Sequence, residues 1–189
     1  MPPAKMRYDI HTGDSAPWYA LVTAAEAVDR RLLPQELERY LVTTLLRFLG
    51  RGDLAPTLRS VPADPRSRVP VKSHRTLRNL GDRCLIYTGL FAEQMAQAQM
   101  PAGYYVAMGR RAYARLGHRG DPLFTRLSDY FVQLMDLLQT MRELDDGHAS
   151  LDPLSAYQLW HDTGSRHAWR VLCRASAGTP CASGQPAVH

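Results

Sequence analysis

The stretch GDRCLIYTGLFAEQMAQAQMPAGYYVAMGRRAYARL, residues 81–116, decides the fold of this chain. It places Gly81, Gly89 and Gly109 inside two segments whose apolar spacing predicts helices. A glycine inside a helix costs about 1 kcal/mol relative to alanine. Three of them cost about 3 kcal/mol, which is large beside the roughly 5–15 kcal/mol of net stability of a typical domain. The stretch therefore predicts a place where a backbone closely approaches another helix or a ligand.

The rest of the chain also has helical spacing of apolar residues. The sequence predicts about six helices, near residues 16–32, 35–49, 74–100, 104–116, 122–144 and 154–174. The first carries an apolar face of Trp18, Leu21, Ala25, Val28 and Leu32. The fifth has the most regular pattern, made of Leu123, Leu127, Tyr130, Leu134, Leu137, Met141 and Leu144. We therefore predict an all-α, single-domain bundle.

Three segments lack helical periodicity. Residues 51–72 contain four prolines and are predicted to form a long, mobile basic loop after the second helix. Residues 1–14 are predicted to be a flexible N-terminus, and residues 175–189 a disordered tail. The helical domain is accordingly expected to span residues 15–174.

Composition indicates an intracellular protein without a membrane span. No run of about 18 apolar residues could cross a membrane, and the N-terminus has no apolar signal segment. The three cysteines, Cys84, Cys173 and Cys181, are odd in number and have no CxxC spacing. They predict neither a disulfide framework nor a zinc site. We expect a cytoplasmic protein.

The net charge of +5 comes from one segment of the chain. Residues 51–78 hold seven basic and two acidic residues, and the remainder is balanced. One interpretation is a basic arm that binds an anionic partner. The other is a solvated connection, which is the commoner case for a run of charge. The candidate anion-binding residues are Arg59, Arg66, Arg68, Lys72 and Arg75.

The sequence contains no recognisable catalytic or metal-binding motif. It has no Glu-x-x-His pair for a di-iron bundle, no Gly-x-Ser-x-Gly nucleophile elbow and no Walker A loop. Cys84 lies on an apolar helical face, which predicts an inert buried thiol with a raised pKa. We therefore predict no catalytic residue, no metal and no cofactor.

Two interpretations of the 81–116 block remain. In the first, its small residues let helices pack closely, and its tyrosines complete the core. In the second, its glycines line a pocket between facing helices. The candidate ligand-binding residues are then Asp82, Arg83, Tyr87, Gly89, Tyr104, Tyr105, Gly109, Arg110 and Tyr113.

The runs GD-x-x-L-I-Y-T-G-L-F and YY-x-x-M-G-x-x-A-Y-x-x-L, preceded by HRTLRNL, carry a resemblance. Over residues 75–116 the chain resembles a group of uncharacterised bacterial helical proteins. The resemblance implies a cytosolic bacterial protein with a helical fold. It implies no activity.

The leading functional hypothesis is a non-enzymatic cytosolic regulatory or adaptor protein that binds a protein partner through helical surfaces and forms a homo-oligomer, most simply a dimer. One alternative is a nucleic-acid-binding regulator that uses the basic segment 51–78. The other is a helical protein that binds a small ligand or cofactor in a pocket at residues 81–116.

Overall fold

The computed structural model describes residues 15–49, 73–92, 100–147 and 151–176. These residues form helices and contain no strand, which confirms the all-α prediction. The helices are α1 (Ala16–Asp29), α2 (Gln35–Leu49), α4 (His74–Leu90), α6 (Ala102–Gly117), α7 (Pro122–Asp129), α8 (Phe131–Asp146), α9 (Pro153–Thr163) and α10 (Arg166–Ala175). The predicted N-terminal segment 1–14, the basic loop 51–72 and residues 177–189 of the tail lie outside the described residues. Among the described helices, none has the length and apolar character needed to cross a membrane.

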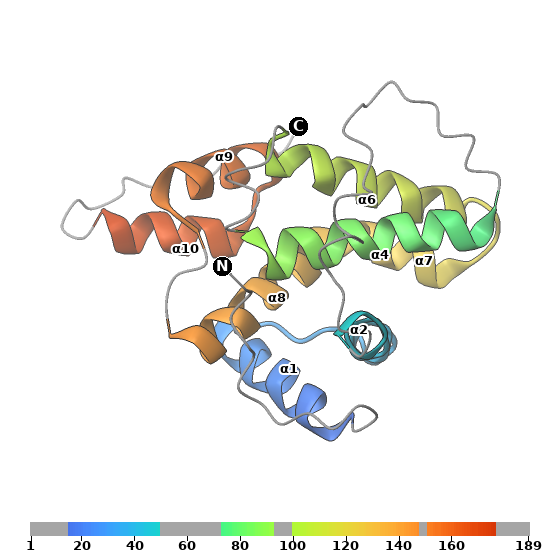
Figure 1. Ribbon diagram of the computed structural model, residues 1–189, viewed down its shortest axis with the longest axis horizontal. Helices are drawn as coiled ribbons and strands as arrows, with labels where there is room; N and C mark the ends of the chain where they lie inside the picture. Colours follow the sequence, from blue (N-terminus) through green and yellow to red (C-terminus); the bar gives the residue numbers. More distant parts are fainter. Residues whose placement is uncertain (1–14, 50–72, 93–99, 148–150, 177–189) are drawn as a thin grey trace.

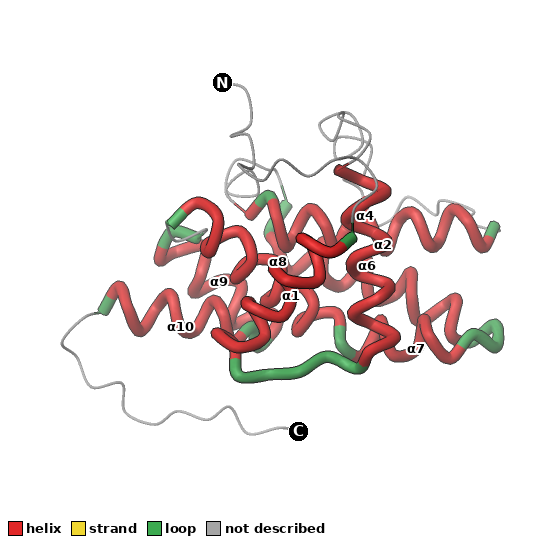
Figure 2. Tube along the Cα trace, turned by 90° about the horizontal axis from the view of Figure 1, so that it is seen from below, coloured by secondary structure: helices red, strands yellow, loops and turns green. Residues whose placement is uncertain are grey.

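The helices pack around the pair formed by α4 and α6, which lie side by side in Figure 1. Helix α8 packs against both α4 and α1. Helices α9 and α10 contact each other and lie at the opposite end of the molecule from α7 (Figures 1 and 2). One cluster of buried apolar side chains joins all these helices.

The described residues form eight helices rather than about six, because two predicted helices are divided. Helix α9 ends at Gly164, whose positive φ of 72° is a left-handed cap, and the Ser165 side chain then caps α10. The fifth predicted helix is interrupted at Tyr130, between α7 and α8. There Arg110 of α6 donates a hydrogen bond to the Ser128 carbonyl, so an intrahelical partner for that carbonyl is not needed. The sequence has no proline or glycine that would indicate this break.

The first predicted helix is too long. Helix α1 ends at Asp29 because Arg30 takes a left-handed conformation and the buried Glu26 side chain accepts a hydrogen bond from the Leu33 N–H. The chain therefore turns away, and Leu32 is 82% exposed instead of lying on the predicted apolar face. Val28 is exposed as well, while Val22 takes a core position. The spacing of apolar residues could not predict the hydrogen bond between Leu33 N–H and Glu26.

The third predicted helix is also shorter than expected. Helix α4 ends at Leu90 rather than near residue 100, and residues 93–99 lie outside the described part. Side chains of α8 bind its last carbonyls: Gln139 donates to Thr88 O and Arg142 to Leu90 O. These tertiary hydrogen bonds satisfy groups that a longer helix would satisfy itself.

Candidate functional site

The glycines of the 81–116 block lie where helices cross. A methyl group at Gly89 would come within 2.5 Å of Leu138 on α8, and one at Gly109 within 2.5 Å of Phe131 on α8. At Gly81 it would overlap the ring of Tyr113 on α6. Any larger residue at these positions would need its neighbours to move. The three glycines therefore lie at close helix contacts, which is the arrangement that the packing interpretation predicts.

The block also holds a buried carboxylate with several partners from other helices. Asp82 is fully buried, and its Oδ1 accepts hydrogen bonds from the hydroxyls of Tyr40 (2.5 Å) and Tyr113 (2.7 Å). Its Oδ2 pairs with the guanidinium of Arg47 and lies 3.8 Å from Arg78 Nε. Arg78 Nε also donates to the Tyr40 hydroxyl, at 3.3 Å. Helices α2, α4 and α6 thus meet at one ionic and hydrogen-bonded centre, which we call the Asp82 cluster.

The tyrosines of the Asp82 cluster predict that the folded state loses stability at alkaline pH. Burial, followed by the nearby Asp82 charge, raises the pKa of Tyr40 and Tyr113 above the usual value near 10. An unfolded tyrosine loses its proton near pH 10, so above that pH the unfolded chain binds fewer protons than the folded one. Stability is therefore fully present below pH 10 and falls as pH rises through the folded pKa values.

We expect the free energy of unfolding of wild type to decrease from pH 10 upward. In Tyr113→Phe the decrease should be shallower by up to about 1.4 kcal/mol per pH unit, which corresponds to one proton. Urea unfolding at pH 8 to 11.5, with absorbance at 295 nm to follow phenolate formation, measures both. Equal slopes in the two proteins would contradict a protonated, buried Tyr113.

Two residues of the Asp82 cluster were predicted from the sequence as site residues. Asp82 and Tyr113 were among the predicted ligand-binding residues, and the structure joins them by a hydrogen bond. Tyr40 and Arg47 were missed because they lie 42 and 35 residues before Asp82, on a separate helix. No local signal indicated them, because Asp82 stands between Gly81 and Arg83 and nothing in these neighbours points to α2.

The other predicted ligand-binding residues are distributed over α4 and α6. Tyr87, Tyr104 and Tyr105 form a ring cluster, with centroids 5.0 Å apart for Tyr87–Tyr105 and 5.4 Å for Tyr104–Tyr105. Arg110 is exposed and binds the backbone of α7, while Arg83 is half-buried. Gly89 and Gly109 are in the packed crossings described above. A ligand role for these residues stays a prediction.

Of the predicted anion-binding residues, the structure describes one. Arg75 is exposed in the first turn of α4. Arg59, Arg66, Arg68 and Lys72 lie outside the described residues. Cys84 is buried against Gly109, and burial raises the pKa of its thiol to about 12, as the sequence predicted.

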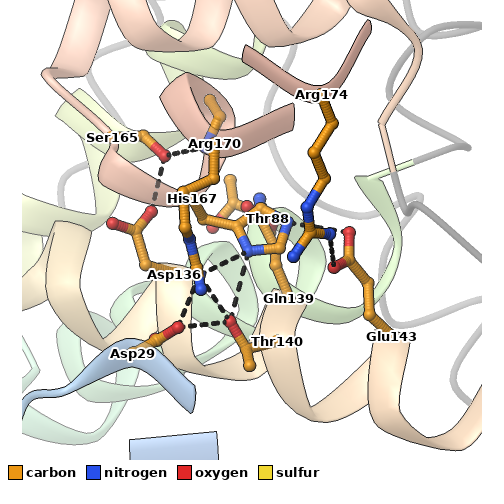
Figure 3. A network of polar contacts seen from close by, with 11 residues as sticks. Asp29, Thr88, Asp136, Gln139, Thr140, Glu143, Ser165, His167, Arg170 and Arg174 are labelled. Carbon is orange, nitrogen blue, oxygen red and sulfur yellow. Dashed lines mark hydrogen bonds and ion pairs between the residues drawn. The ribbon is translucent and has the colours of Figure 1, made fainter. Parts of the chain in front are cut away.

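A second polar network joins α10 to α8 and α1 (Figure 3). At one side, Asp136 accepts hydrogen bonds from the Ser165 hydroxyl (2.6 Å) and the Arg166 N–H (3.0 Å) at the start of α10. Burial raises the pKa of Asp136, while the Ser165 hydrogen bond opposes that change. At the other side, Arg170 pairs with Asp29 at 2.5 Å. The network fixes the position of α10.

His167 lies at the centre of this network between a hydroxyl and a carboxylate. Its Nδ1 is 3.2 Å from Thr140 Oγ1, and its Nε2 is 3.0 Å from Glu143 Oε1. This order of groups resembles that of a catalytic triad. However, Thr140 is only 2% exposed, and its hydroxyl lies 2.9 Å from Asp29 Oδ1 and accepts from Arg170. Because a substrate could not reach it, we assign the arrangement to the stability of the fold.

Helices α9 and α10 also carry a connected group of aromatic side chains. The Tyr157 ring stacks on His161 at 6.0 Å and contacts Trp160 at 6.1 Å, and Trp160 lies 4.9 Å from Trp169. Leu154 lies one turn before Tyr157 on α9. We call these five residues the aromatic face.

Within the described residues, no group of three or more histidine, cysteine, aspartate or glutamate side chains is arranged to hold a metal ion. The chain matches no protein-family model, no curated protein and no solved structure. Its function is therefore inferred from the contacts and exposed surfaces themselves.

Proposed function

We propose that this chain is a non-enzymatic regulatory or adaptor protein that binds a protein partner through the aromatic face of α9 and α10. The observation that supports the proposal is the exposure of Leu154 (67%) and Tyr157 (51%), which continue into half-buried tryptophans. Tyrosine and tryptophan side chains dominate the binding energy of protein interfaces, and contiguous exposed apolar groups are uncommon outside them. The aromatic face therefore has the composition of an interface centre.

The charges around the aromatic face favour a protein over a polyanion. The exposed charged residues of α9, α10 and the α9 cap are Asp152, Asp162, Arg166 and Arg174, which together have no net charge. A nucleic acid or an anionic membrane would gain little electrostatic attraction from such a surface. The partner that fits has an apolar centre.

A second copy of this chain is the other possible occupant, because the sequence predicts a homo-oligomer. Two-fold pairing of the aromatic face would place Leu154 and Tyr157 of one copy against the same surface of the other. We propose a heterologous partner and treat self-association as an outcome of the test.

The test places a photo-crosslinking amino acid at position 157 in the full chain, in its native host. A matched control carries it at Ala107, which is exposed on α6. We expect a single major adduct from position 157 and none from position 107. Leu154→Ser in the same chain should weaken binding to the identified partner about tenfold, because apolar groups at an interface centre carry most of the affinity.

The adduct's mass and crosslinked peptide decide the outcome. A different protein, linked through an apolar surface, supports the proposal. An adduct of twice the chain mass would replace it with self-association through α9. Equal crosslinking from positions 157 and 107 would show that the aromatic face has no specific partner.

A further inference from the structure

We propose that Arg47 and Arg78 form a binding site for a phosphate group at the surface between α2 and α4. The ligand class is inorganic phosphate or the terminal phosphate group of a small molecule. This site is distinct from the aromatic face: the first turns of α4 lie at the other end of the molecule from α9 and α10 in Figure 1.

The described residues of the Asp82 cluster carry an excess of positive charge. One buried carboxylate, Asp82, faces two guanidinium groups, Arg47 and Arg78, and so leaves an excess of one positive charge. Neutralising Asp82 requires only one of them. The excess is directed outward, because the Arg47 and Arg78 side chains are 29% and 36% exposed while Asp82 is fully buried.

Both guanidinium groups are held in place by neighbouring aromatic rings. Arg47 lies over the ring of Phe48, 5.1 Å from its centroid, and Arg78 lies over the ring of Tyr40 at 5.3 Å. Both approach the same oxygen, Asp82 Oδ2, so they lie near each other although they come from different helices. Groups that are already ordered lose little entropy when they bind a ligand.

Both guanidinium groups keep N–H donors that no described residue accepts from. Each guanidinium has five N–H donors. Hydrogen bonds with the described residues use one from Arg47, to Asp82, and one from Arg78, to Tyr40. Thr44, on the same side of α2 between Tyr40 and Arg47, has a buried hydroxyl without a partner in the described part of the chain. The described residues therefore do not exhaust the polar capacity of this contact.

The surroundings add one more positive charge. The first turn of α4 carries the exposed Arg75 and no acidic residue. Backbone N–H groups at a helix start also favour anions. A phosphate dianion, with oxygens in several directions, can contact two guanidinium groups from different helices at once, and it gains more from this charge than a carboxylate does.

The experiment titrates the full-length protein with inorganic phosphate at constant ionic strength, with sodium chloride as the reference salt. The side-chain Nε–Hε signals of the arginines are followed by NMR, and the melting temperature is measured in parallel. We expect saturable shifts of the Arg47 and Arg78 signals. Arg78→Gln should bind phosphate about tenfold more weakly, because a charge-assisted contact is lost. The control Arg111→Gln, which changes an exposed arginine on α6, should bind like wild type.

Each result decides the proposal. Equal responses to phosphate and chloride, or unchanged affinity in Arg78→Gln, would overturn it. If Arg78→Gln does not fold, as judged by circular dichroism, the Arg78 signal in wild type decides instead, and Arg78→Lys should bind with intermediate affinity because it keeps charge without the planar fork. A single-stranded oligonucleotide that binds at low salt while phosphate does not would overturn the discrete site in favour of nucleic-acid binding.

Discussion

Asp82→Ala is expected to lower the free energy of unfolding by about 3–5 kcal/mol, the cost found when one partner of a buried ion pair is removed. The reason is the number of groups that depend on this carboxylate. Arg47 loses its ion-pair partner, and the hydroxyls of Tyr40 and Tyr113 lose their acceptor in a buried site. For a domain of typical stability, roughly 5–15 kcal/mol, this is a large fraction of the total.

The measurement is urea unfolding followed by circular dichroism, with Asp152→Ala as the matched control. Asp152 is exposed and accepts hydrogen bonds from the N–H groups of Leu154 and Ser155 at the start of α9. Loss of such a cap costs about 1 kcal/mol. A loss in Asp82→Ala no greater than in Asp152→Ala would mean that the three helices do not converge on Asp82.

Asp82→Asn separates the charge from the shape of the side chain. Its amide keeps one acceptor oxygen for the tyrosine hydroxyls but loses the ion pair with Arg47. We expect a smaller loss than in Asp82→Ala, and a weakened coupling between positions 82 and 47 in a double-mutant cycle. Identical stability of the alanine and asparagine variants would show that the ion pair contributes the whole effect.

The fold could be predicted wherever apolar spacing alone determined burial. Leu127, Leu134 and Leu137 of the fifth predicted helix were identified from their spacing and are buried. The prediction was wrong where a polar contact from elsewhere in the chain redirected the backbone. Glu26 binds Leu33 N and exposes Leu32, and Arg110 binds Ser128 O at the break before α8. Such contacts have no periodicity.

The candidate site was predicted in part for the same reason. Asp82 and Tyr113 lie in the glycine-bearing block and were selected with it. Tyr40 and Arg47 are on α2, and no local signal links them to Asp82. The aromatic face was not identified either, because its spacing on α9 resembles that of buried residues. Only the packing of the other helices shows that Leu154 and Tyr157 are left exposed.

Gly109→Leu should also be strongly destabilising, by about 3 kcal/mol or more, at the upper end of overpacking effects. A Cβ atom at position 109 would lie 2.5 Å from two ring atoms of Phe131 and 2.8 Å from the Cβ of Cys84. Both neighbours are fully buried, so neither can move aside into solvent. For a chain of this length, 3 kcal/mol corresponds to a melting temperature lower by about 10 °C.

The comparison of Gly109→Leu with Ala107→Leu distinguishes the two interpretations of the glycine block. Ala107 is exposed on the same helix, so the same leucine there should change stability by no more than about 0.5 kcal/mol. If α6 packs directly against α8 and α4, only Gly109→Leu lowers the melting temperature. If Gly109 instead lines a ligand cavity, leucine would fill that cavity, and the melting temperature would stay at the wild-type value or rise. A melting temperature that falls in the Gly109 variant alone therefore assigns the glycine to the helix crossing.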